Sequence, residues 1–192
     1  MTHSPLDPVL VIYAGGTIGM IETPSGLAPG PDMEARVRDA LATLPDDRRT
    51  ALPPFTWIEV DQPIDSSGAR PEDWARLAAL VAEQANRHRG VVVLHGTDTL
   101  AWTASSLAYQ LQGIDRPVVV TGSMAPLAQQ HSDALYNLES ALRYAAMPEL
   151  QEVAVSFGDK LLRGSRARKW HTREPDAFES PNLDLLGKRH GN

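Results

Sequence analysis

Five short apolar runs, most of them rich in valine and isoleucine, alternate along this chain with segments of helical periodicity. The runs have the length of buried strands and lie at 9–14, 55–60, 91–96, 117–122 and 152–158. A strand–helix–strand order requires crossover connections, so it predicts an α/β fold with a mainly parallel sheet and helices on both faces. Because such a sheet is covered on each side, its strands are apolar throughout instead of alternating with polar residues.

Three segments between the later runs carry apolar residues at helical spacing and predict amphipathic helices. Their apolar faces are Trp74, Leu77, Ala78, Val81 and Ala85, then Leu100, Ala104, Leu107 and Leu111, then Leu135, Leu138, Leu142 and Ala145. We expect Pro71, followed by two acidic residues, to open the first helix. Asp98 and Asp133 are predicted to cap the second and third helices, and Pro148 to follow the third.

Two connections show neither the apolar runs of strands nor the spacing of helices. Residues 20–34 contain three prolines and two glycines, which predicts a flexible loop, and residues 44–55 form a second, polar connection. Neither has the character of an interdomain linker, so the sequence predicts one domain over residues 1–192.

Composition narrows the classes of function. The net charge is −6 and the pI is near 5.5, which argues against nucleic acid as a partner. With no cysteine, the chain has no disulfide, no thiolate metal site and no cysteine nucleophile. The six histidines show no metal-ligand spacing, and His95 is predicted to be structural, so we expect no metal. No signal peptide or membrane span is recognisable, which favours the cytoplasm and no membrane partner.

Small and polar residues follow four of the predicted strands, in "YAGGT", "LHGTD", "VTGSM" and "SFGDK". Ligands of open parallel sheets bind beyond the carboxyl ends of the strands, where a glycine lets the backbone turn tightly or approach a ligand closely. Four such endings on one edge predict a binding or catalytic site. The alternative is that these residues only cap helices.

Two threonines at these strand ends are candidate nucleophiles. Thr17 follows two glycines, while Thr97 and Asp98 stand at the start of a predicted helix, whose unpaired N–H groups can stabilise an oxyanion. Ordinary capping is the alternative for all three. A hydroxyl nucleophile also needs a proton acceptor, and the run 160–173, with six cationic side chains and no acid, could supply an amine. A solvated basic face is the other interpretation of that run.

The segments "YAGGTIGM" and "LHGTDTLAWTASSLAY" resemble the two signature motifs of bacterial-type L-asparaginases. "PIDSSGARPEDW", "PVVVTGSMAPL", "SDALYNLESAL" and "SRARKWHTREPDAFESPN" follow in that family's order, so the chain resembles the amino-terminal domain of the cytoplasmic type I branch. The resemblance implies Rossmann- or flavodoxin-like layering, no cofactor, and a homodimer or homotetramer. The implied substrate is L-asparagine, with L-glutamine as a second candidate.

The resemblance also implies roles for particular residues. Thr17 would attack the side-chain amide, and Thr97, Asp98 and Lys169 would form a second hydroxyl–carboxylate–amine triad. The substrate would be held at Asp65, Ser66 and Ser67 and against the motif glycines Gly16 and Gly96.

The sequence departs from the family pattern in ways that keep other functions open. Leu27 stands where the family's loop carries a tyrosine that hydrogen-bonds the nucleophile, Met124 and Gly68 replace common polar residues, and the smaller carboxyl-terminal domain is absent from residues 1–192. A non-catalytic amino-acid-binding or subunit-interaction module is one alternative, and the amidase subunit of a tRNA-dependent amidotransferase is another. A dinucleotide site is excluded, because "GGTIG" lacks the required glycine spacing.

Overall fold

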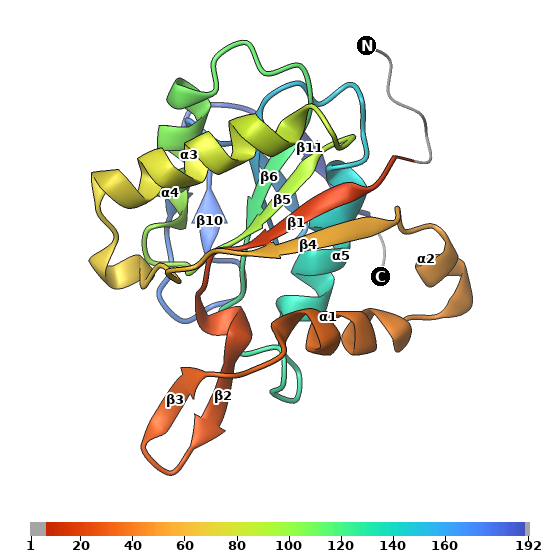
Figure 1. Cartoon of the computed structure of the whole chain (residues 1–192), viewed down its shortest axis with the longest axis vertical. Coiled ribbons are helices and arrows are strands. Elements are labelled where there is room, and N and C mark those ends of the chain that lie inside the picture. The colour runs from red at the N-terminus through yellow and green to blue at the C-terminus, as the bar shows by residue number, and fades with distance from the viewer. Residues whose placement is uncertain (1–6, 191–192) are drawn as a thin grey trace.

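A seven-stranded sheet forms the centre of the computed structural model, which describes residues 7–190 (Figure 1). Five strands run parallel, and β8 is antiparallel to both of its neighbours. The predicted mainly parallel α/β fold is confirmed. In spatial order the strands are β11 (Gly187–Lys188), β8 (Lys160–Arg163), β7 (Val153–Phe157), β6 (Val118–Thr121), β5 (Val91–Leu94), β1 (Val9–Tyr13) and β4 (Phe55–Glu59).

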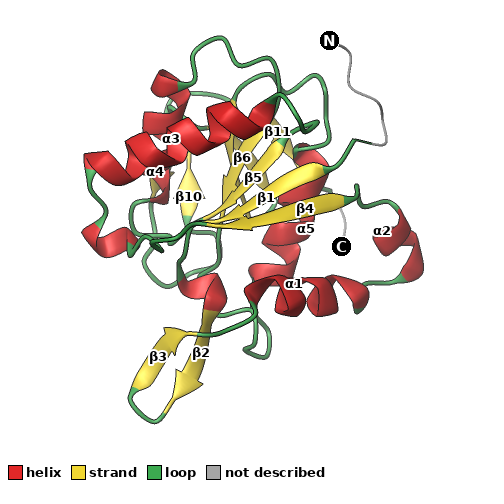
Figure 2. Cartoon of the chain, in the orientation of Figure 1, coloured by secondary structure: helices red, strands yellow, loops and turns green. Residues whose placement is uncertain are grey.

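Helices cover both faces of this sheet, as Figure 2 shows. Successive residues of β1 point to opposite sides: Leu10 and Ile12 pack in one buried cluster, Val9 and Val11 in the other. The first cluster contains the apolar faces of α3 (Pro71–Ala85) and α4 (Leu100–Gln110), and the second those of α1 (Met33–Ala42) and α5 (Ala134–Tyr144). The continuous apolar runs therefore reflect burial on two sides.

Some of the predicted helix boundaries are confirmed and others are wrong. Pro71 is the first residue of α3, and Pro148 follows α5, as predicted. Asp98 is not the N-cap of α4, because Thr99 holds that position. Asp133 does hold the N-cap position of α5, but its carboxylate accepts hydrogen bonds from the backbone N–H groups of the 124–125 turn instead of capping the helix. A carboxylate can satisfy any nearby unpaired donor, and the sequence does not say which.

The segment 20–34 is structured, which corrects the prediction of a flexible loop. Strands β2 (Met20–Thr23) and β3 (Gly26–Pro29) pair as a hairpin that projects from the body of the molecule, and α1 begins at Met33 (Figure 1). Gly26 turns the chain with φ of 107°, and the Thr23 hydroxyl donates to its carbonyl at 2.7 Å. The connection 44–55 likewise contains a short helix, α2 (Asp46–Thr50).

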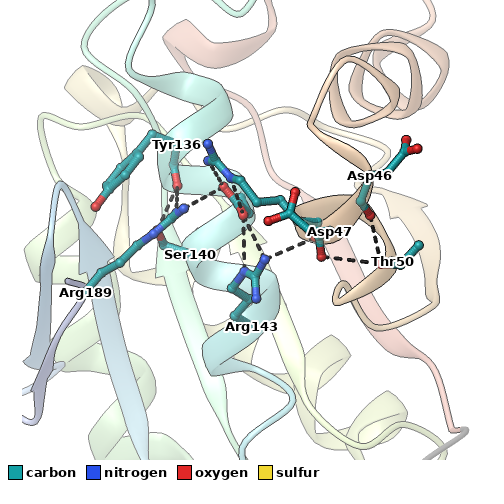
Figure 3. Close-up of polar contacts among 9 residues, drawn as sticks. Asp46, Asp47, Thr50, Tyr136, Ser140, Arg143 and Arg189 are labelled. Carbon is teal, nitrogen blue, oxygen red and sulfur yellow. Dashed lines mark hydrogen bonds and ion pairs between the residues drawn. The ribbon is translucent and has the colours of Figure 1, made fainter. Parts of the chain in front are cut away.

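Glu139 on α5 ties three parts of the chain together through a fully buried carboxylate. Arg48 of α2 pairs with it. Two further arginines, labelled in Figure 3, also bind it: Arg143 lies 3.0 Å away, and Arg189, just after β11, lies 2.8 Å away. Burial opposes ionisation of Glu139, but hydrogen bonds from Arg48, Arg189 and Arg143 outweigh it and lower the pKa of the carboxyl from 4.5 to about 2. The carboxylate is thus the electrostatic centre that fastens α2 and the β11 end to α5.

Replacing Glu139 by glutamine should lower the free energy of unfolding at pH 7 by about 3 kcal/mol, because three guanidinium groups lose their buried counter-charge. The carboxyl has a lower pKa folded than unfolded, so its contribution is complete above pH 4.5 and disappears as the pH falls through about 2. Urea unfolding of both chains from pH 7 to pH 2 measures the difference.

The matched control is Glu34→Gln, which removes an exposed ion pair with Arg38 and should cost less than about 0.5 kcal/mol. Equal losses in the two variants, or a Glu139 effect that stays constant down to pH 2, would contradict this account.

Candidate functional site

The ends of the neighbouring parallel strands β1 and β5 meet through two glycines. Gly16 has φ of 98° and ψ of 174°, a conformation that essentially only glycine adopts, and a Cβ placed on it would lie 2.4 Å from the backbone nitrogen of Gly96. A Cβ on Gly96 would lie 2.3 Å from the Ser66 Oγ. Gly96 therefore touches both Gly16 and Ser66, and Thr17 and Thr97 each follow directly after one of the two glycines.

Thr97 and Asp98 are joined by Lys169, which lies 72 positions after Thr97. The Lys169 Nζ donates to the Thr97 Oγ1 at 2.9 Å and to the Asp98 Oδ1 at 2.8 Å. Lys169 belongs to the short strand β9 (Arg168–Lys169), which pairs antiparallel with β10 (Phe178–Glu179) beside α4. Its side chain is only 16% exposed. The geometry thus brings together the three residues predicted as a hydroxyl–carboxylate–amine triad.

Ser66 and Ser67 lie in a one-turn 3-10 helix, η2 (Ser66–Gly68), and Asp65 is its N-cap. The Asp65 Oδ1 accepts from the Ser67 backbone N–H at 3.0 Å and from its hydroxyl at 2.9 Å. The Thr99 hydroxyl donates to the Ser66 carbonyl at 2.7 Å, which binds this turn to the start of α4. Asp65 and Ser67 are exposed, while Ser66 is buried against Gly96.

Thr17 begins a second 3-10 turn, η1 (Thr17–Gly19), and is half-buried. Arg36 of α1 holds this turn by donating to the Gly19 carbonyl at 2.9 Å. The hydroxyl of Tyr13 also lies against it, because a Cβ on Gly19 would lie 1.9 Å from that oxygen, and burial raises the pKa of the phenol. The Thr17 hydroxyl makes no hydrogen bond to any other residue of 7–190. It remains available to a bound molecule.

The Thr97 backbone N–H is a second group without a partner among residues 7–190, although Thr97 is only 6% exposed. Buried N–H groups are nearly always hydrogen-bonded, so an unpaired one at a strand end indicates a place for an acceptor atom. Acyl transfer requires an attacking oxygen, an amine that exchanges protons and a donor for a developing oxyanion, and the Thr17 hydroxyl, Lys169 and the Thr97 N–H are groups of these kinds.

Only two of the four predicted strand ends contribute these groups. After β6, the Ser123 hydroxyl donates to the Ala125 carbonyl within its own loop. After β7, the backbone N–H of Gly158 donates to Asn137, and Asp159 pairs with Lys188 at 3.1 Å. These polar groups have partners within the fold, whereas the Thr17 hydroxyl and the Thr97 N–H have none in residues 7–190.

Several residues that hold the site have no signal in the sequence. In the sequence, nothing distinguishes Thr99 from other N-cap residues, Arg36 from other helix arginines or Tyr13 from other strand tyrosines. Only contacts across the fold show that Thr99 fixes η2 and that Arg36 and Tyr13 fix η1. Leu27, at the position where a tyrosine was expected, is 51% exposed on β3.

Residues 7–190 contain neither a cluster of metal-binding side chains nor a membrane-spanning helix. No group of three or more acidic or histidine side chains there could hold a metal ion. No helix in that part of the chain is long and apolar enough to cross a membrane.

Known proteins resemble this chain over most of its length. The family model described as "Asparaginase, N-terminal" matches residues 8–192. L-asparaginase 1 of Escherichia coli (strain K12) is 42% identical over 178 residues, which are 93% of this chain and 52% of that protein. The crystal structure of L-asparaginase I from Vibrio cholerae O1 biovar eltor str. N16961 superposes with a TM-score of 0.85 at 39% identity, covering 97% of this chain and 55% of that one.

A relative with a different name matches over less of the chain. One of the subunits of the glutamyl-tRNA(Gln) amidotransferase of Thermoplasma acidophilum is 37% identical over 133 residues, which are 66% of this chain and 32% of that protein. The chain spans about half the length of the Escherichia coli and Vibrio cholerae asparaginases.

Replacing Gly16 by alanine should lower the free energy of unfolding by about 3 kcal/mol or more, because it combines backbone strain with a clash against Gly96. Gly68→Ala is the matched control, since a Cβ there meets nothing within 4 Å and its φ is ordinary. Urea unfolding measures both, and a Gly16 variant as stable as the Gly68 variant would show that the two strand ends do not need this contact.

Proposed function

The chain belongs to the asparaginase family, and from that premise we propose that it hydrolyses the side-chain amide of L-asparagine to L-aspartate and ammonia. One observation carries this proposal beyond the resemblance. Lys169, Thr97 and Asp98 form a hydrogen-bonded triad directly beyond Gly96, which is in contact with the glycine that precedes Thr17.

In the proposed reaction, the Thr17 oxygen attacks the amide carbon of the substrate. The hydroxyl proton passes to the leaving nitrogen as the C–N bond breaks, so ammonia departs and an acyl ester remains on Thr17. Water then attacks the ester carbon, returning the proton to Thr17 and releasing aspartate. Thr17 suits this role because its oxygen has no other partner in residues 7–190 and its turn is held on two sides by Tyr13 and Arg36.

Proton transfer is the proposed task of Thr97, Asp98 and Lys169. Since the Lys169 Nζ donates to the Thr97 oxygen, the hydroxyl hydrogen of Thr97 is free to point toward a neighbour, and the pair can relay a proton between nucleophile and leaving group. Asp98 holds the amine in place at 2.8 Å. This ion pair is partly exposed and contributes little to stability, which favours a role in chemistry.

Substrate recognition is assigned to the η2 turn and the two glycines. We propose that Asp65 binds the α-amino group of the amino acid while Ser66 and Ser67 receive its α-carboxylate. Gly16 and Gly96 let the amide approach the backbone closely. L-glutamine is the second candidate substrate, because it carries the same amide on a side chain longer by one methylene.

Residues 1–192 correspond in this proposal to the catalytic amino-terminal domain, acting in the cytoplasm as a homodimer or homotetramer and without a cofactor. Self-association is supported by Trp102 and Tyr109, two aromatic side chains on α4 that are 68% and 66% exposed. The mass of the protein in solution tests the oligomeric state.

Purified chain should release ammonia from L-asparagine, and Thr17→Val should reduce the rate at least about a thousandfold because it removes the nucleophile. A coupled assay for ammonia measures the rate, beside calorimetry of L-aspartate binding. Thr43→Val, which alters an exposed threonine at the end of α1, is the matched control and should keep the full rate.

The other functions give different results in the same assay. If the unmodified chain binds aspartate but releases no ammonia from asparagine or glutamine, it is an amino-acid-binding module. Ammonia release that requires charged tRNA and a further protein component would identify part of an amidotransferase.

Leu27→Tyr should raise the turnover number severalfold, because a phenol on the hairpin could hydrogen-bond the Thr17 hydroxyl and help to activate it. Leu27→Phe adds the ring without the hydroxyl and is the control. If the tyrosine variant is no faster than the phenylalanine variant, another group activates Thr17.

A further inference from the structure

His95, the residue that follows β5, lies completely inside the protein and uses both ring nitrogens. Its Nδ1 lies 2.8 Å from the Gly96 carbonyl oxygen, and its Nε2 lies 3.1 Å from the Thr103 Oγ1 on α4. A carbonyl only accepts, so Nδ1 carries the hydrogen, and the Thr103 hydroxyl donates to Nε2. Burial lowers the pKa of the imidazole, so the ring is neutral at physiological pH.

The bond to the Gly96 carbonyl also fixes the next N–H group. Gly96 and Thr97 share a trans peptide, in which C=O and N–H point in opposite directions. Because the carbonyl points at the buried imidazole, the Thr97 N–H points away from it. That N–H has no partner within residues 7–190. The backbone of glycine is more flexible than that of any other residue, so the hydrogen bond from His95 restricts rotation of the Gly96–Thr97 peptide more than it would at another residue.

We propose that His95 is a positioning residue that locks the Gly96–Thr97 peptide with the Thr97 N–H directed at the carbonyl oxygen of the substrate amide. The inference rests on the proposed function, and it assigns His95 no proton transfer. The N–H stabilises the negative charge that develops on that oxygen, while the Thr103 hydroxyl satisfies the other ring nitrogen of His95.

Three variants test whether the hydrogen bond from His95 to the Gly96 carbonyl affects catalysis or only stability. His95→Leu removes the hydrogen bonds to both Gly96 and Thr103. His95→Asn keeps an N–H near the position of the Nδ1–H group. Thr103→Val removes only the hydrogen bond between Thr103 and Nε2. We expect the leucine variant to lose about tenfold to a hundredfold in kcat with KM changed less than about threefold, since removing an oxyanion donor typically costs up to about a thousandfold. The asparagine and valine variants should stay within about threefold of the unmodified kcat, although their melting temperatures fall.

Equal kcat losses for leucine and asparagine, or a leucine variant changed only in melting temperature, would overturn the proposal. A measurement on the unmodified chain does not depend on the folding of any variant. The ring ¹⁵N shifts of His95 near neutral pH should show a neutral ring with its hydrogen on Nδ1, and an Nε2–H tautomer would also overturn the proposal.

The outcomes separate this inference from the proposed function. An unmodified chain that releases no ammonia contradicts the function. If the unmodified chain is active and the His95→Leu variant keeps its kcat, only the positioning role of His95 is contradicted.

Discussion

The contact between Gly16 and Gly96 is the constraint on which the arrangement of the site depends. Two neighbouring parallel strands end at the same edge of the sheet, and side chains at Gly16 and Gly96, shortly after the strand ends, would hold the following turns apart. With no Cβ at either position, the two backbones touch and Ser66 closes on them from η2. Thr17 and Thr97 follow directly, so the separation of the two hydroxyl-bearing segments is set by backbone contact and not by flexible side chains.

Two charged clusters of this molecule have opposite characters. Glu139 is fully buried among three arginines and joins segments far apart in the sequence, which makes it a stabilising element of the fold. Asp98 is 60% exposed and pairs with a single lysine, so water screens the pair and little stability follows from it. Lys169 also reaches Thr97, and that shared contact is what makes the second cluster a candidate for chemistry.

Much of the architecture was predictable because it follows from local patterns. An unbroken apolar run indicates a strand that is buried on both faces, and apolar residues at a spacing of 3.6 indicate the buried face of a helix. The hairpin at 20–29 was missed because its prolines and glycines favour a loop, whereas cross-strand pairing determines the outcome. Asp133 was assigned to the wrong partner for a similar reason, since a carboxylate bonds whichever unpaired donors the fold places near it.

The sequence by itself determined the class of fold, the edge of the sheet where the polar residues gather, and the presence of two threonine-bearing glycine turns. Periodicity and the backbone freedom of glycine are properties of short segments, so they can be read without knowing the fold. Only the tertiary structure decided that two of four strand ends remain available, that Lys169 reaches Thr97 across 72 positions, and that His95 faces Gly96 with its Nδ1. Hydrogen bonds between distant segments depend on distances and directions that packing sets, and a linear pattern carries neither.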